Sequence, residues 1–189
     1  DWPSQKPQVP FRVLPVVYEE TTDGTVLEIA ESQAIERYLA RKYNLLGSDL
    51  WEEHLVNRYY HSSDVLQVGF GIRVVGAAPE ARGEAAKKFY TETLAIWIST
   101  HEEHLKNNGD HGHYVGKTTT LADLKTAQLI NRILLQVPKG VEAPLSAEKT
   151  PSLWKVKEAI EAESASLVAW HKSPRYEEVE SNTKARFGF

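Results

Sequence analysis

The sequence has no cysteine among its 189 residues, which excludes disulfide bonds and thiolate nucleophiles and is compatible with the cytosol. It also lacks any apolar run approaching the ~20 residues that a membrane-spanning helix requires, so no membrane partner is expected. Basic residues are not in excess: the formal net charge is -4, and no long basic run offers a surface for nucleic acid. The 41% of hydrophobic residues are ordinary for a globular protein and are sufficient for a sizeable core.

Short motifs that carry chemistry on their own are missing as well. The sequence has no nucleophile motif, no phosphate-binding loop and no set of metal ligands. His101 and His104 are three residues apart, not four as in the zinc-protease helix motif, and His111 and His113 flank a glycine. We expect these to be solvated histidines near a helix end, and no metal site.

The first 44 residues contain the signals of a β-hairpin followed by one helix. Residues 1–10 are polar and contain three prolines, so a loop is expected there. Helical spacing begins at Ser32, which can serve as the N-cap, and Gly47 lies just beyond the end. The patterns between them predict a strand, a turn and a second strand at Leu14–Tyr18, Thr21–Gly24 and Thr25–Ile29.

The remaining chain, residues 50–189, is helical in character. Gly69 and Gly71 are expected to kink the first of its helices. The predicted helices are Leu50–Val75, Pro79–Lys106, Thr120–Gln136 and Pro151–His171. One face of the second of these helices carries Tyr90, Leu94, Trp97, His101 and Leu105.

The predicted fold class is therefore α+β, with a hairpin-plus-helix domain at residues 1–44 and an all-α bundle at residues 50–189. A two-stranded hairpin with one helix is marginal as a folding unit and leaves a sheet edge unpaired. We therefore expect partner strands, and interpret the sequence as a fragment or as a chain that pairs with another segment.

Two groups of motifs, far apart in the sequence, occur in the order of a known family. The first group is Trp2–Lys6, Pro10–Val16 and Glu31–Ala40, and the second is Tyr114–Gly116 and Thr120–Leu124. Together they resemble the glutathione transferases, most closely the sigma class, over essentially the whole chain. The resemblance implies a thioredoxin-like domain followed by a helical bundle. The first strand, first helix and second strand of that domain have no counterpart here, so the usual catalytic tyrosine is expected upstream of Asp1.

The resemblance implies that glutathione is held by residues around the hairpin. Pro15 would follow a cis peptide bond, and the backbone of Leu14 would pair with the cysteinyl part of glutathione like an added strand. From the residues alone, an ordinary trans proline is the alternative. Ser32 and Glu31 would hold the γ-glutamyl end, because free N–H groups at a helix N-terminus attract an anion. A plain N-cap with a solvated neighbour is the alternative.

At the other end of the peptide, Trp2 and Lys6 match a pattern in which an indole N–H and an ammonium hold the glycyl carboxylate. A surface lysine and a packed loop tryptophan are the alternative. Val13 departs from the sigma pattern, which has a glutamine there. Since valine cannot donate or accept a hydrogen bond through its side chain, the departure lowers the expected affinity or shifts recognition to Leu14 and Ser32.

In the bundle, Thr120 and Asp123 form the pattern of a capping box, which is a structural role. In related enzymes an acid from the neighbouring subunit reaches glutathione, and the match to that position falls on His61. We expect a solvated polar face for Asn57, His61 and Asp64 instead.

The function that the resemblance implies is conjugation of the thiol of glutathione to a small hydrophobic electrophile, by a cytoplasmic homodimer. An enzyme of this kind lowers the pKa of the thiol with a hydroxyl group and presents the thiolate. Two alternatives stay open: a non-catalytic protein of the same fold with a structural or partner-binding role, and a glutathione-dependent isomerase. The electrophile pocket is expected near Tyr60, Phe70, Ile72, Phe187 and Phe189.

Overall fold

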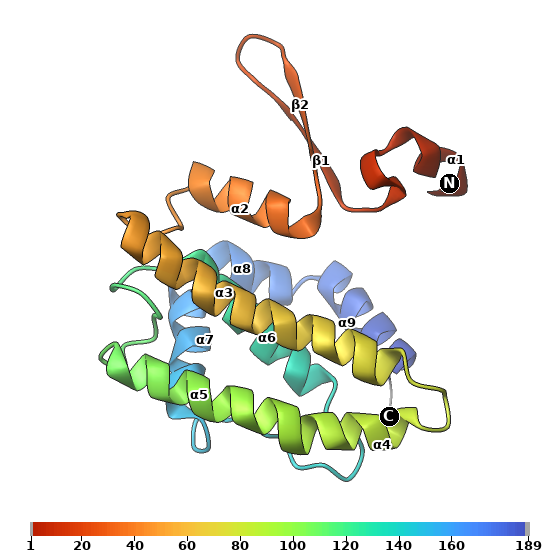
Figure 1. Cartoon of the computed structure of the whole chain (residues 1–189), viewed down its shortest axis with the longest axis vertical. Helices are drawn as coiled ribbons and strands as arrows, with labels where there is room; N and C mark the ends of the chain where they lie inside the picture. Colours follow the sequence, from red (N-terminus) through yellow and green to blue (C-terminus); the bar gives the residue numbers. More distant parts are fainter. Residues whose placement is uncertain (1, 188–189) are drawn as a thin grey trace. The chain divides into compact units, whose positions relative to one another are not determined.

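The structure, a computed structural model, describes the backbone of residues 2–187 and the side chains of residues 2–182 (Figure 1). The chain divides into two compact units, one ending at Leu46 and the other beginning at Gly47. Each unit has its own architecture, a hairpin with a helix in the first and a helical bundle in the second. This confirms the predicted fold class.

The first unit opens with short helical turns in place of the predicted loop. These turns are α1 (Trp2–Gln5), η1 (Lys6–Gln8) and η2 (Pro10–Arg12). The prediction was wrong because Pro7 and Pro10 stand within the first two positions of their turns. At those positions the missing N–H of proline has no helical partner to lose.

The predicted hairpin is confirmed, with both strands beginning slightly later than expected. Strand β1 (Val16–Glu20) pairs antiparallel with β2 (Val26–Ala30), and these two form the sheet within the described residues. Tyr18 and Glu28 face each other across the ladder, and the Tyr18 hydroxyl donates to Glu28 Oε2 at 3.0 Å. The turn is closed by a hydrogen bond of 2.8 Å from Thr21 N–H to the Thr25 carbonyl.

Helix α2 (Ser32–Lys42) contacts both strands of the hairpin. Lys42 Nζ lies 2.6 Å from Glu19 Oε1, which ties the last turn of α2 to β1. The N-cap is Glu31, not Ser32 as predicted, and Ser32 is the first helical residue. The chain leaves β2 through an unusual backbone conformation at Glu31, and the helix starts one residue earlier than its sequence pattern indicates.

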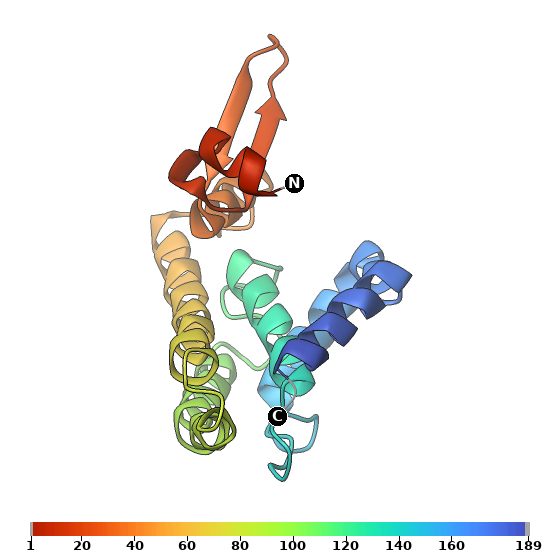
Figure 2. The same cartoon turned by 90° about the vertical axis from the view of Figure 1, so that its right-hand side faces the viewer.

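The second unit is built on α3 and α6. In Figures 1 and 2, α6 (Leu121–Leu135) lies between α3 (Leu50–Phe70) and α7 (Pro151–Glu163), and it contacts both. Asp49 caps α3, because its Oδ1 accepts from the N–H groups of Trp51 and Glu52 at 2.8 and 2.9 Å. The other elements are η3 (Gly71–Val75), α4 (Arg82–Lys88), η4 (Phe89–Thr93), α5 (Leu94–Asn107), α8 (Ala165–His171) and α9 (Pro174–Phe187).

Three predicted helices are interrupted. The first continues through a π-helical turn that starts at Gly71, where a kink was expected. The second begins at Arg82 and contains the π-helical turn η4. The helix predicted at Pro151–His171 is divided into two helices, because Ser164 leaves helical geometry (φ -130°, ψ 86°). The Ser164 side chain accepts a hydrogen bond from Leu167 N–H at the start of α8. Serine favours such a cap because its hydroxyl satisfies a free N–H of the new helix.

The core of the second unit contains the predicted apolar face. Its apolar members, Tyr90, Leu94, Trp97 and Leu105, are buried, as the helical spacing predicted, and His101 on the same face is buried with them. Within residues 2–187, none of the helices has both the length and the apolar character to cross a lipid bilayer.

Candidate functional site: one end of the hairpin

The register of the hairpin brings two of the predicted binding segments to the same end. Val16 pairs with Ala30, so the residues just before β1 and just after β2 leave the ladder together. Leu14–Pro15 and Glu31–Ser32 therefore lie at the end of the hairpin opposite the Thr21–Gly24 turn. This proximity depends on strand pairing and cannot be read from either segment alone.

The Leu14–Pro15 peptide bond is cis, as the resemblance implied. Leu14 lies outside the ladder, which begins at Val16, and the residue is 61% exposed. Its peptide N–H and carbonyl therefore take no part in the described sheet. Backbone groups in this situation can pair with an extended peptide as an added strand.

Glu31 has φ 70° and ψ 118°, a region that residues other than glycine rarely adopt. Strain of this kind tends to cluster at ligand-binding positions. The Glu31 side chain makes no capping hydrogen bond to α2, and the N-terminal end of a helix can bind an anion through its N–H groups and its dipole. Glu31 and Ser32 are both exposed at that end.

The other predicted glutathione contacts precede β1. Trp2 lies in α1 and is half-buried, and Lys6 opens η1 and is exposed. Val13 is 46% exposed beside Leu14 and offers only an apolar side chain. The first unit thus presents the ammonium of Lys6, the N-terminus of α2 and the exposed backbone of Leu14, groups that suit a short peptide with carboxylates at both ends.

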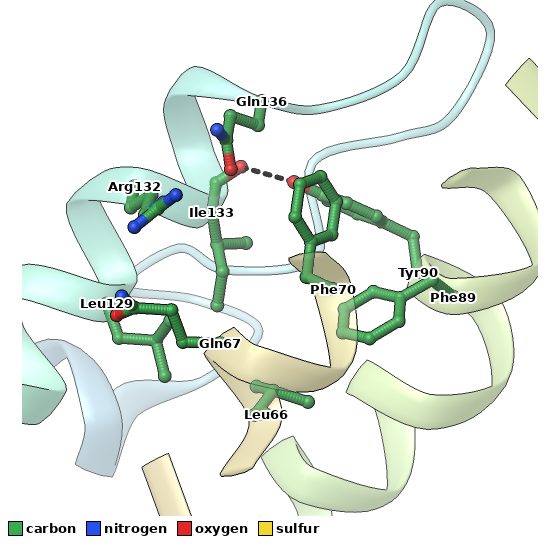
Figure 3. A pocket seen from close by; sticks show the side chains of 9 residues that line it. All are labelled: Leu66, Gln67, Phe70, Phe89, Tyr90, Leu129, Arg132, Ile133 and Gln136. Atoms are coloured by element: carbon green, nitrogen blue, oxygen red, sulfur yellow. Dashed lines mark hydrogen bonds between the residues drawn. The ribbon is translucent and has the colours of Figure 1, made fainter. Parts of the chain in front are cut away.

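The second unit contains a separate pocket between α3, η4 and α6 (Figure 3). Phe70, predicted for the electrophile site, lines it. Tyr60 and Ile72 do not, because Tyr60 is fully buried and Ile72 is 71% exposed. The side chain of Phe187, and Phe189 as a whole, lie outside the described residues. The lining residues are Leu66, Gln67, Phe70, Phe89, Tyr90, Leu129, Arg132, Ile133 and Gln136.

The hydroxyl of Tyr90 in this pocket is structural. It donates to the Ile133 carbonyl at 2.8 Å, and burial raises the pKa of Tyr90 well above its usual value. A phenol in this state is a poor activator of a thiol, since it resists giving up its proton.

The polar face expected on α3 is partly buried, and the prediction for Asp64 was wrong. Asp64 Oδ1 lies 3.1 Å from Lys125 Nζ, and both side chains are nearly excluded from solvent. Asp64 is therefore turned toward α6. His61 is exposed, and Asn57 is half-buried with its amide donating to the Glu53 carbonyl at 2.9 Å.

The expectation of solvated histidines was also wrong for His101 and His113. His101 is 1% exposed; its Nε2 lies 2.8 Å from Ser62 Oγ and its Nδ1 lies 2.5 Å from the Tyr114 hydroxyl. Burial, and then the nearby His104, lower the pKa of His101 to about 3. The one indication of this burial in the sequence was the place of His101 on the apolar face of its helix.

His113 is buried as well, between two carboxylates. Its Nδ1 lies 3.8 Å from Asp123 Oδ2 and its Nε2 lies 3.4 Å from Glu163 Oε1. The interaction with Asp123 raises the pKa of His113. Across residues 2–182, no cluster of His, Asp and Glu side chains has the arrangement of a metal site.

The capping box of α6 is present. The Thr120 N–H and hydroxyl donate to Asp123 Oδ2 at 2.8 and 2.7 Å. Asp123 has a second task that sequence reasoning missed, because its Oδ1 accepts from Tyr114 N–H at 2.8 Å. Asp123 therefore fixes the loop before α6 as well as the start of the helix.

Comparison with known proteins gives the family. The model for the glutathione S-transferase C-terminal domain matches residues 72–174, over half of the chain. The probable glutathione S-transferase 7 of Caenorhabditis elegans is 33% identical over 132 residues, which cover 68% of this chain and 61% of that protein. The class-mu 28 kDa glutathione S-transferase of Schistosoma japonicum is 28% identical over 133 residues, which cover 70% of this chain and 64% of that protein. The chain thus spans somewhat less than two thirds of the length of these relatives.

Among solved structures, the sigma-class glutathione transferase of Fasciola hepatica superposes with a TM-score of 0.76 at 23% identity. The superposition covers 90% of this chain and 78% of that one, and it supports the fold. Relatives of the mu class and a structure of the sigma class thus both match, so the likeness extends to the family and not to one class. From the match of the C-terminal domain model, the chain belongs to the glutathione S-transferase family.

Proposed function

We propose that this protein binds glutathione at the end of its hairpin and conjugates the thiol to small hydrophobic electrophiles. The observation that carries the proposal is the meeting of Leu14–Pro15 and Glu31–Ser32 at one end of the hairpin. An exposed backbone segment and a helix N-terminus there suit the extended backbone of glutathione, which carries a carboxylate at each end.

Each proposed contact follows from the chemistry of the tripeptide. Ser32, through its N–H and hydroxyl, holds the γ-glutamyl carboxylate, and the carboxylate of Glu31 faces the γ-glutamyl ammonium. The backbone of Leu14, before Pro15, pairs with the cysteinyl residue. The ammonium of Lys6 and the indole N–H of Trp2 hold the glycyl carboxylate.

The reaction itself needs the thiolate of glutathione. In the proposal the hydroxyl that lowers the pKa of the thiol comes from a segment outside this sequence, as the family resemblance implies. The residues of this chain then bind and orient the peptide so that its sulfur faces the electrophile. Holding two reactants in this way removes much of the entropic cost of their encounter.

The proposal includes a sigma-like class, a cytoplasmic location and a homodimer. A groove along α3 and α5 supports the dimer. Its walls include the exposed, apolar Val65 and Ile96, which are 67% and 69% exposed, and the basic residues Arg58 and Arg73. Exposed apolar side chains rimmed by charged ones are typical of a protein interface.

The test is glutathione-dependent turnover of an activated aryl halide by the natural full-length protein, after retention on a glutathione resin. Retention with turnover is the expected result. Retention without turnover would leave binding intact but remove conjugation of such electrophiles, and favour an isomerase. Failure on both counts would contradict the proposal and favour a structural or partner-binding role.

A further inference from the structure

His113 is held in place between two helices of the second unit. It lies in the loop before α6, and its side chain is 7% exposed. The Asn108 amide donates to the His113 carbonyl at 2.9 Å, and the next N–H, that of Tyr114, donates to Asp123 at 2.8 Å. Because the backbone is secured on both sides, the imidazole ring keeps its place between its two carboxylate neighbours.

The two carboxylates beside His113 differ in their freedom to move. Asp123 is fully buried, and its Oδ2, 3.8 Å from His113 Nδ1, already accepts two hydrogen bonds from Thr120. Glu163, the last residue of α7, is 47% exposed, and its Oε1 lies 3.4 Å from His113 Nε2. The other oxygen of Glu163 accepts from the Thr119 hydroxyl. Asp123 is therefore fixed, whereas Glu163 can exchange His113 for water.

The protonation state of His113 decides whether both contacts form. An imidazolium donates from both nitrogens, but a neutral imidazole has one N–H and one lone pair. Between two carboxylates, the lone pair of the neutral ring faces an oxygen that cannot donate to it. Since the buried Asp123 cannot turn to water, the contact with Glu163 is the one that is lost. The interaction with Asp123 raises the pKa of His113, so this loss occurs above pH 6.5.

The positive charge at this place comes from histidine. Among the described residues, the titratable groups that face His113 are Asp123 from α6, Glu163 from α7 and His111 from its own loop, whose ring centre lies 5.7 Å away. This set contains no lysine or arginine, so the two carboxylates share the charge of His113. Removing that charge leaves the carboxylates without an ion-pair partner in the set.

Glu163 stands where α7 ends and α8 begins (Figure 1). Ser164 leaves helical geometry and caps α8, and none of the residues of α8 is buried. A short helix without buried side chains gains little from packing, so its stability depends on how its ends are attached. The contact between His113 and Glu163 secures one of those ends.

We propose that His113 and Glu163 form a pH-sensitive clasp that holds the start of α8. With His113 protonated, the clasp is closed and α8 is held in place. As the pH rises and His113 loses its proton, Glu163 retains only Thr119 and water as partners, and α8 opens more often. The residues of the clasp all belong to the second unit, so the inference does not depend on glutathione binding.

The test is amide hydrogen exchange of α8 between pH 6 and pH 8.5, expressed as protection factors so that the intrinsic pH dependence of exchange is removed. Wild type should lose protection in α8 about threefold over this range, as expected for one partly exposed ion pair. His113→Gln should abolish this loss. His171→Gln is the matched control and should retain it, because the charge of His171, in the last turn of α8, also favours the helix at low pH.

Glu163→Gln is a second variant, at a half-exposed position, for the case that His113→Gln does not fold. Its amide keeps the hydrogen bond with Thr119 but not the charge, so α8 should be as weakly protected at pH 6 as it is in wild type at pH 8.5. Protection of α8 that does not change with pH in wild type would overturn the inference. A loss that persists in the folded variants of His113 or Glu163, or that disappears in His171→Gln, would overturn it as well.

Discussion

Lys125 Nζ lies 3.1 Å from Asp64 Oδ1, and this ion pair joins α6 to α3 inside the bundle. The side chains are 7% and 10% exposed, and Lys125 Nζ also lies 5.2 Å from the centre of the Tyr60 ring. A buried pair of this kind is costly to desolvate, but it is more costly to break, because one charge would then remain uncompensated. The pair therefore fixes the register between the two central helices of the unit.

The first prediction concerns that pair. Asp64→Ala should lower the free energy of unfolding by about 3–5 kcal/mol, because it leaves the Lys125 ammonium buried without its carboxylate. Urea unfolding monitored by circular dichroism measures the change. Glu142→Ala is the matched control, because the Lys149–Glu142 pair is solvent-exposed and should contribute nothing measurable. Equal, small effects of the two substitutions would contradict a structural role for the buried pair.

His101 should make the stability depend on pH. Its pKa is about 3 in the folded protein and 6.5 in an unfolded chain, so between these values the unfolded chain binds a proton that the folded protein does not. The contribution of neutral His101 to the free energy of unfolding is fully present above pH 6.5. It is lost as the pH falls below this value, by about 1.4 kcal/mol per pH unit. The pKa of His113 is raised, so its contribution to stability has the opposite pH dependence: it is present at low pH and is lost as the pH rises through the pKa of the folded protein.

The comparison that isolates His101 is unfolding of wild type and His101→Gln between pH 4 and pH 7. Glutamine can hydrogen-bond Ser62 and Tyr114 but does not titrate, and every other titrating group, His113 included, is common to both proteins. The variant should lose less stability on acidification than wild type. Parallel pH profiles would show that His101 is not held neutral by the fold.

Asp123 should matter more than its partner in the capping box. Thr120→Ala removes one cap contact and should cost about 1 kcal/mol. Asp123→Ala leaves the buried N–H groups of both Thr120 and Tyr114 without an acceptor, so about 3 kcal/mol is expected. Thermal unfolding of the two variants measures which one loses more stability. An equal loss in both would mean that the hydrogen bond from Tyr114 N–H contributes nothing to stability.

The backbone conformation of Glu31 should lower the stability of the protein. Glycine adopts φ 70° without the steric cost that glutamate has there, so Glu31→Gly should stabilise the protein by about 1 kcal/mol. Glu31→Gln, which keeps a Cβ and removes only the charge, is the control and should show no such gain. Destabilisation by Glu31→Gly, measured in the same unfolding assay, would contradict the assignment of strain to this residue.

Local patterns in the sequence predicted much of the fold. Alternating residues and the Thr-Thr-Asp-Gly turn predicted the hairpin, and the spacing of Tyr90, Leu94 and Trp97 predicted the buried face of the second long helix. The π-helical turns and the break at Ser164 were missed, because periodicity alone does not distinguish a continuous helix from one with a local change in hydrogen bonding.

The parts of the site that sequence reasoning missed depend on contacts between distant residues. Asp64 and His101 were both predicted to be solvated because of their polar side chains. Their partners, Lys125 from α6 and Tyr114 from a later loop, explain how these side chains are buried. The pocket around Arg132 is similar, since its walls come from elements that the bundle brings together. The six residues proposed to bind glutathione remain a prediction from the family resemblance and the hairpin geometry.

The most direct measurement is calorimetric titration of the natural protein with glutathione, for wild type, Ser32→Ala and Ser181→Ala. The account predicts saturable binding, one glutathione per chain, weakened about tenfold by Ser32→Ala because a hydrogen bond to a carboxylate is lost. Ser181→Ala, at an exposed serine of α9, should bind as wild type does. Absence of binding, or wild-type affinity in Ser32→Ala, would contradict a glutathione site at the end of the hairpin.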